Sequence, residues 1–153
     1  MNGTTQSESG VVAGYDEWRF PRYTQRQLER VVTRGRIRAT SLFEMLVCAG
    51  DQAPAFFVVL SGRVEITRPG DGEEKPVVTY GPGQFTGEIN LLTGRRALVQ
   101  ARVIEAGEVI EIEREGMLEL VQRDAEIGAM LMRAFILRRV QLVARGEVDV
   151  GGR

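Results

Sequence analysis

The 153-residue chain predicts a mainly β fold: an antiparallel β-roll of the jelly-roll (double-stranded β-helix) type, with a short N-terminal helix and two C-terminal helices. Two observations support this expectation. Between about residues 36 and 113, short apolar or alternating runs recur at regular spacing and are separated by Gly, Pro and Asp turn residues. After Arg114 the apolar residues recur with the period of about 3.6 that is typical of helices.

The N-terminal region predicts a polar tail followed by one helix. Residues 1–13 are small and polar, which is typical of a disordered tail. A short helix is expected to begin after Thr24, a favourable N-cap, and to end near Gly35. The folded domain is expected over residues 14–146, with residues 147–153 as a tail or the beginning of a linker.

The central region predicts eight short strands. Ser61-Gly62 and Glu105-Ala106-Gly107 have turn chemistry and are expected to separate neighbouring strands. Val64 and Ile66 alternate with polar residues, so they are expected on one face of their strand. The clearest strand patterns cover residues 55–60, 63–67, 77–80, 97–103 and 109–112.

The last third predicts a short helix over residues 114–122 and a long one over residues 125–144. Between residues 127 and 144, 13 of 18 residues are apolar, which is wider than the stripe of a helix packed on one side. The long helix is therefore expected to cover its own roll with one side and a second copy with the other, giving a homodimer. Three cations between these sides are interpreted as a solvated face in preference to an anion site: Arg133, Arg138 and Arg139.

The charge and hydropathy of the chain exclude several classes of partner. The chain has 20 Lys and Arg against 21 Asp and Glu, a formal net charge of −1. General polyanion binders carry a clear basic excess, so direct DNA binding is not expected. The apolar runs are far shorter than the roughly 20 residues of a membrane-spanning helix, and the N-terminus lacks the pattern of a signal peptide. A cytoplasmic location without membrane contact is expected.

The chain has no histidine and one cysteine, Cys48. The absence of histidine removes Ser-His-Asp chemistry, the commonest zinc sites and the commonest general base. A single cysteine closes no intramolecular disulfide, and Cys48 follows the apolar stretch 45–47, so a buried core position is expected for it. No catalytic residue and no metal site are expected, and we interpret the chain as a non-enzyme.

Residues 81–99 carry the most specific pattern. They combine a glycine turn, an acidic residue, a short apolar stretch and paired arginines that enter a strand. A helical turn beginning near Glu88 would direct backbone N–H groups at an anion, and an arginine nearby would add a charged partner for a phosphate. A carboxylate accepts hydrogen bonds from sugar hydroxyls, and Gly87 would allow close approach of a ligand. The alternative is that the glycines form turns and the charges form surface ion pairs.

The segment from Phe85-Thr86-Gly87-Glu88-Ile89 to Arg96-Ala97 resembles the phosphate-binding cassette of cyclic-nucleotide-binding domains of the Crp/Fnr type. Ala49-Gly50-Asp51 and the run 56–64 are similar to the early strands of that family. The resemblance covers about residues 24–145 and implies cAMP or cGMP as the ligand. It assigns the ribose 2′-hydroxyl to Glu88 and the cyclic phosphate to Arg96, with backbone N–H groups from Gly87, Ile89 and Ala97.

Three positions depart from the family pattern. The spacing from Glu88 to Arg96 is one residue shorter than in typical cassettes, which leaves Arg95 as an alternative partner for the phosphate. Leu98 replaces a small or hydroxylated residue, and Phe43 stands where many relatives have a glycine.

A narrower resemblance covers residues 81–88, 94–98 and 131–139, which look like the N-terminal sensor domain fused to bacterial thioredoxin-reductase-like flavoproteins. It implies a C-terminal reductase domain as the regulated partner. Up to Arg153 the chain has neither a G-x-G-x-x-G fingerprint nor a CxxC pair. The expected function is a non-catalytic regulatory sensor. The alternatives are a degenerate roll that serves as a dimerisation or docking scaffold and, less favoured, the sensor half of a transcription regulator.

Overall fold

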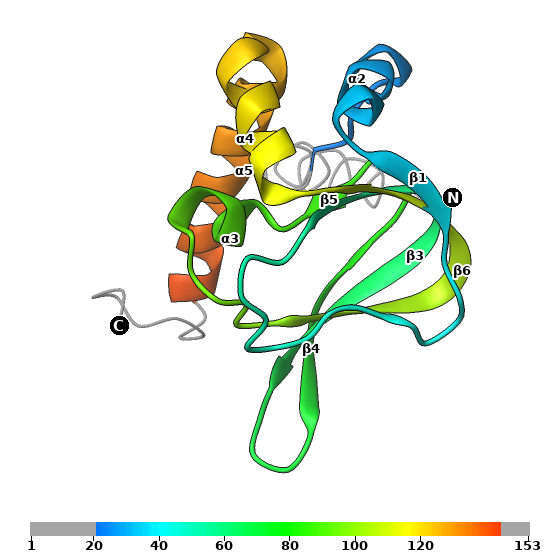
Figure 1. Ribbon diagram of the computed structural model, residues 1–153. Coiled ribbons are helices and arrows are strands. Elements are labelled where there is room, and N and C mark those ends of the chain that lie inside the picture. The colour runs from blue at the N-terminus through cyan, green and yellow to red at the C-terminus, as the bar shows by residue number, and fades with distance from the viewer. Residues whose placement is uncertain (1–20, 145–153) are drawn as a thin grey trace, which may run out of the picture.

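The computed structural model describes the backbone of residues 21–144 and the side chains of residues 21–138. The expectations for residues 1–13, Arg139 and residues 147–153 lie outside these ranges. Helices α2 and α4 lie at one end of a β-roll, α5 runs from there along its side next to α3, and the β3–β4 hairpin projects from the other end (Figure 1). The helices and the 3-10 turn η1 are α2 (Gln25–Val31), η1 (Val32–Arg34), α3 (Glu88–Thr93), α4 (Arg114–Arg123) and α5 (Ala125–Ala144).

The roll is one antiparallel sheet of six strands in the order β1-β6-β3-β4, with β2 paired to β6 and β5 paired to β3. The strands are β1 (Arg36–Ala39), β2 (Met45–Val47), β3 (Phe56–Pro69), β4 (Glu74–Tyr80), β5 (Phe85–Thr86) and β6 (Gln100–Ile112). The predicted fold class, with its short N-terminal helix and two C-terminal helices, is confirmed.

The strand count differs from the expected eight because β3 and β6 continue through the two predicted turns. They bend together as a hydrogen-bonded pair, with register shifts between Val59 and Val64. A Cβ on Gly62 would lie 2.4 Å from the carbonyl oxygen of Glu105, and one on Gly107 would lie 2.2 Å from that of Ser61. The glycines are therefore needed for close backbone contact at a shared bend rather than for a chain reversal.

The predicted beginning of α2 is confirmed in detail. The Thr24 hydroxyl accepts a hydrogen bond from the Gln27 N–H at 3.2 Å, and the Gln27 side chain accepts one from the Thr24 N–H at 2.8 Å. This reciprocal capping box satisfies two N–H groups that the first turn leaves without partners. The helical segment then ends through η1 at Gly35.

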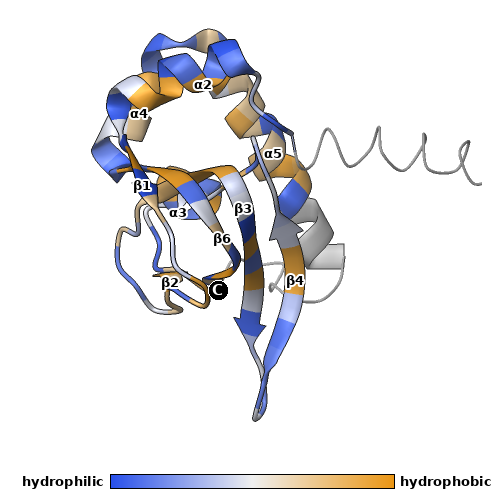
Figure 2. Ribbon diagram, turned by 90° about the vertical axis from the view of Figure 1, so that its right-hand side faces the viewer, coloured by the Kyte–Doolittle hydropathy of each residue, from blue (hydrophilic) through white to orange (hydrophobic). Residues whose placement is uncertain are grey.

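The interior has two apolar clusters, one on each side of the β3–β6 pair, and the helices cover the first (Figure 2). Alternate residues of β3 contribute to different clusters: Phe56 and Val58 face the helices, whereas Phe57 and Val59 face the inside of the roll. The α5 residues Ile127, Leu131 and Ala134 are fully buried on the first cluster. In the described part of the chain, no helix is long and apolar enough to cross a membrane.

Cys48 is exposed, so the expectation that it is buried is wrong. Strand β2 ends at Val47, whose side chain is buried in the roll. Cys48 follows in the next position and begins a turn, in which its N–H donates to a carboxylate oxygen of Asp51 at 2.8 Å. Because successive side chains point to opposite faces, the thiol of Cys48 points outward, although the residues before it are apolar.

Candidate functional site

The cassette-like segment, residues 85–97, runs from β5 through α3 toward β6. Gly87 is the N-cap of α3 and has a φ of 111°, a backbone conformation that favours glycine. A Cβ at this position would lie 3.3 Å from the Cα of Phe56 and 3.4 Å from the carbonyl oxygen of Ala55. The close approach expected for a ligand at Gly87 is thus made by the protein's own strand β3, and it fixes α3 against the roll.

Glu88, the first residue of α3, is 4% exposed and forms an ion pair with Arg138 of α5. Arg138 is 5% exposed, so the interpretation that it lies on a solvated face is wrong. The same guanidinium also donates a hydrogen bond to the carbonyl oxygen of Phe85 at 3.2 Å. The expected ribose acceptor is therefore held by a cation from the long helix, 50 residues further along the chain.

Two aromatic rings complete the surroundings of Arg138. Its guanidinium carbon lies 4.9 Å from the ring centroid of Tyr80 and 4.7 Å from that of Phe85, which are cation–π distances. Tyr80 belongs to the cluster inside the roll, and Phe85 belongs to the cluster beneath the helices. Arg138 therefore connects α5 with both cores and with the cassette-like segment.

A periodic signal for the burial of Arg138 was present in the sequence. Ile127, Leu131, Ala134 and Arg138 follow one another at intervals of four, three and four residues, which places them on one helix face. The first three are fully buried on the roll, and Arg138 continues their stripe. The prediction of a solvated face rests on the general preference of arginine for solvent and gives this periodicity too little weight.

Tyr23, in the segment before α2, packs against the same group of residues. Its ring stacks on that of Phe85 with centroids 4.9 Å apart, and the side chain is buried. Its hydroxyl has no hydrogen-bond partner among the described residues. Burial raises the pKa of the Tyr23 phenol above its usual value, and the positive charge of Arg138 opposes that rise.

The other predicted site residues lie beside and after α3. Ile89 is half-buried in its first turn, whereas Arg95 and Arg96 are exposed beyond its end. Ala97 is buried, and its N–H donates to the carbonyl oxygen of Asp51 at 2.9 Å. The Ala97 N–H that we assigned to a phosphate is therefore engaged within the protein.

Comparison with known proteins gives a family and a set of relatives. The family model of the cyclic nucleotide-binding domain matches residues 38–124. The chain is 30% identical over 115 residues to the cAMP-activated global transcriptional regulator CRP of Haemophilus influenzae, a match that spans 71% of this chain and 51% of that one. The chain spans about half the length of the curated CRP-type relatives it matches.

Solved structures show the same fold. The catabolite activator protein of Thermus thermophilus superposes with a TM-score of 0.66 at 24% identity, over 80% of this chain and 58% of that one. A protein from a cyclic-GMP-dependent signalling pathway that regulates bacterial phytopathogenesis superposes with a TM-score of 0.64 at 26% identity. That match covers 78% of this chain and 95% of the other.

Proposed function

Because this chain belongs to the cyclic nucleotide-binding domain family, whose model matches residues 38–124, we propose that it is a non-catalytic regulatory domain that binds cAMP or cGMP. The observation that carries the proposal is the buried ion pair between Glu88 and Arg138. It joins the first residue of α3, within the cassette-like segment, to the long helix, so a ligand that contacts Glu88 acts directly on α5.

In this proposal the ribose hydroxyl of the nucleotide donates to Glu88, and the cyclic phosphate is bound by Arg96 or Arg95. A carboxylate has two oxygens and accepts several hydrogen bonds, so Glu88 has capacity for a hydroxyl in addition to Arg138. The new hydrogen bond changes the strength of the Glu88–Arg138 pair and therefore the preferred position of α5. A ligand shifts this equilibrium only by its differential affinity for the two positions.

We further propose that the exposed face of α5 receives a second copy of the chain. Ala129, Met132 and Ile136 follow one another at intervals of three and four residues, the spacing of a coiled-coil seam. Met132 and Ile136 are 43% and 54% exposed, although both are large and apolar. This stripe is separate from the fully buried stripe of Ile127 and Leu131 on the roll.

The regulated partner in this proposal is a fused or separate protein of the thioredoxin-reductase-like flavoprotein class, on the basis of the resemblance of residues 81–88, 94–98 and 131–139. The domain itself has a formal net charge of −1, which does not favour contact with DNA. A change in the position of α5 would reach the partner through the two-fold interface or through the chain that follows the helix.

Calorimetric titration with cAMP, cGMP and 5′-AMP tests the proposal. We expect saturable heat with at least one cyclic nucleotide. Binding of 5′-AMP should be much weaker, because its phosphate is not cyclic. Arg63→Ala serves as a control, because Arg63 is exposed on β3 outside the cassette and its loss should leave the affinity unchanged. A protein that is folded and dimeric but binds none of the nucleotides would instead be a scaffold.

A further inference from the structure

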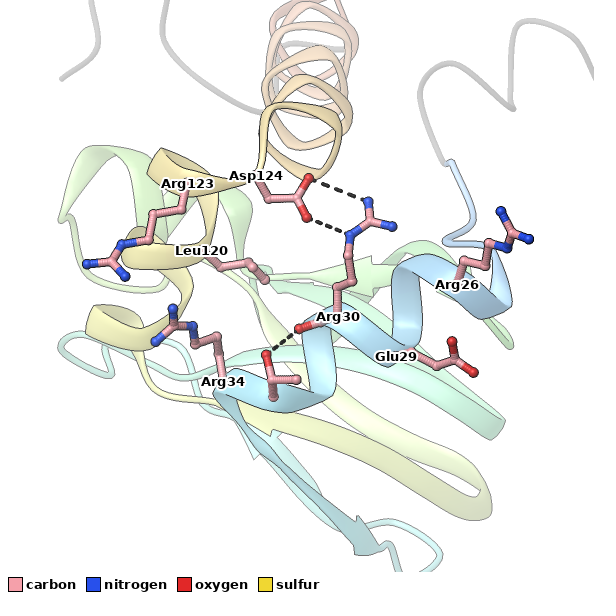
Figure 3. A pocket seen from close by; sticks show the side chains of 8 residues that line it. Arg26, Glu29, Arg30, Arg34, Leu120, Arg123 and Asp124 are labelled. Carbon is pink, nitrogen blue, oxygen red and sulfur yellow. Dashed lines mark hydrogen bonds and ion pairs between the residues drawn. The ribbon is translucent and has the colours of Figure 1, made fainter.

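A second site lies away from the cassette, between the N-terminal helical segment and the corner where α4 meets α5. It is a groove of about 570 Å³. Arg26, Arg30 and Arg34 recur every four residues along one wall, and Arg123 comes from the end of α4 on the other (Figure 3). Glu29 and Asp124 also line the groove, so its lining carries four guanidinium groups and two carboxylates, an excess of positive charge in a chain whose net charge is −1. Nothing in the proposed nucleotide site uses them.

The four arginines differ in how they are engaged. Arg30 contacts the carboxylate of Asp124 with two nitrogens, at 2.7 and 3.5 Å, and also contacts Glu126. Asp124 in turn accepts a hydrogen bond from the N–H of Ile127 in the first turn of α5, at 3.1 Å. Arg30 therefore holds the two walls together and gives the groove a fixed shape. We therefore assign Arg30 a structural role in the groove and not a ligand-binding one.

Arg34 and Arg123 show how an acidic group is held here. From opposite walls they reach the same carboxylate oxygen of Glu119, at 3.2 Å and 3.8 Å. Figure 3 shows both guanidinium groups pointing in the same direction, away from the contact between Arg30 and Asp124. The Glu119 side chain is 46% exposed, and exposed ion pairs of this kind contribute little to stability. An external carboxylate could therefore take the place of Glu119 at small cost.

We propose that this groove binds an acidic segment of a partner protein, with Arg34 and Arg123 as the principal anchors and Arg26 as a further contact. Arginine recognises carboxylates through paired hydrogen bonds, and clusters of arginine are a common means of binding acidic motifs. From Arg26 to Arg34 the helical wall rises about 12 Å, the length of roughly four residues of extended chain. The lining has no aromatic side chain on which a nucleotide base would stack, which favours a peptide over a nucleotide.

The proposal is tested by fluorescence anisotropy of a labelled hexaglutamate peptide at low ionic strength. Arg34→Gln with Arg123→Gln should weaken binding by at least about tenfold, the loss expected for one or two charged hydrogen bonds. Glu119→Gln should tighten binding by about threefold, because it removes the internal competitor. Nonspecific attraction would not produce this pattern, since Glu73→Gln changes the net charge equally at the exposed hairpin tip and should change little.

The control for the arginine pair is Arg63→Gln with Lys75→Gln, which removes the same charge from exposed positions outside the groove. Circular dichroism of each variant establishes that it is folded. Equal binding by the groove variant and this control would overturn the proposal, as would equal effects of Glu119→Gln and Glu73→Gln. Binding of tripolyphosphate through Arg34 and Arg123 without binding of hexaglutamate would also overturn it, because the groove would then be a site for small anions.

Discussion

The guanidinium of Arg138 and the carboxylate of Glu88 form an ion pair in which each side chain is only 6% exposed. Removing two charges from water is costly, and their mutual attraction compensates only when further contacts satisfy both groups. Here Phe85 supplies a carbonyl oxygen and a ring face, and Tyr80 supplies a second ring. The pair therefore fixes α5 against the cassette-like segment. The contributions of Glu88 and Arg138 to stability should depend strongly on each other.

Replacing either partner alone should destabilise the fold. Arg138→Met leaves the Glu88 carboxylate buried without its cation, and breaking a buried pair in this way costs about 3–5 kcal/mol. Adding Glu88→Gln to that variant should recover part of the loss, because the remaining groups are neutral. Urea denaturation of the two single variants and the double variant measures this coupling. Additive effects would show that the two side chains stabilise the fold independently.

Tyr23→Phe should increase stability. The hydroxyl is buried without a hydrogen-bond partner among the described residues, so its removal ends an uncompensated cost of about 1 kcal/mol. Above pH 10 the free energy of unfolding of the variant should exceed that of the wild type by a growing margin, because burial raises the pKa of the Tyr23 phenol. There the unfolded tyrosine ionises while the folded one stays protonated, so the wild type loses about 1.4 kcal/mol per pH unit relative to Phe.

Denaturant unfolding of both proteins at pH 8 and pH 11 measures these two effects. The comparison with Tyr23→Phe cancels the ionisation of every other group that the two proteins share. A stability difference that does not change between the two pH values would mean that the folded phenol ionises as readily as the unfolded one, against the effect expected of burial.

Phe43 has a φ of 67°, in the left-handed region that glycine adopts without strain, and its side chain is 66% exposed. Glycine, which the family resemblance implies at this position, would adopt this conformation without strain. Phe43→Gly should therefore be more stable than Phe43→Ala by about 1 kcal/mol, because alanine keeps the backbone strain and glycine relieves it. Thermal unfolding of the two variants tests this expectation, and an Ala variant as stable as the Gly variant would contradict it.

Ile136→Glu should dissociate the proposed dimer and leave the fold intact. Ile136 is 54% exposed on α5, so a charge there interferes with a second copy but not with the domain core. Leu131→Glu is the matched comparison, since Leu131 is fully buried on the roll and a charge there should unfold the protein. Sedimentation velocity gives the mass and circular dichroism the fold. A wild type that is monomeric at micromolar concentration would refute the dimer.

Local patterns were sufficient to predict most of the elements. Thr24 was identified as an N-cap from its residue type, and the bounds of α5 agree with the predicted helix over residues 125–144. The sequence prediction divides each of the continuous strands β3 and β6 in two. The reason is that the Gly-containing sequences at their shared bend resemble the sequences of turns. Only the pairing of the two strands distinguishes a bend from a turn, and pairing is not a local property.

The errors at the site have the same origin. Arg138 is buried because Glu88, 50 residues earlier in the chain, is present to receive it, and neither residue shows this in its own surroundings. Cys48 is exposed because the turn to Asp51 places it outside the roll. Residue types and motif order identify the cassette-like segment in the sequence, whereas the partner of its carboxylate follows from the packing of α5.

The order of effects among three variants distinguishes Arg96 from Arg95 as the partner that we propose for the cyclic phosphate. If Arg96 is the partner, Arg96→Ala should weaken cyclic-nucleotide binding by about 1.5–3 kcal/mol, the contribution of a hydrogen bond to a charged group, and Arg95→Ala should have little effect. Glu88→Gln should cost less than Arg96→Ala, because an amide oxygen still accepts a hydrogen bond from the ribose.

Both arginines are exposed and precede the buried Ala97, whose N–H already bonds to Asp51. If Arg95→Ala is the damaging change in calorimetric titration, the shortened segment between Glu88 and the arginines has moved the phosphate partner by one residue. Arg63→Ala controls for the loss of a surface charge. If both arginine variants bind the nucleotide as tightly as the wild type does, the phosphate lies away from this segment. That result would contradict the assignment of both residues.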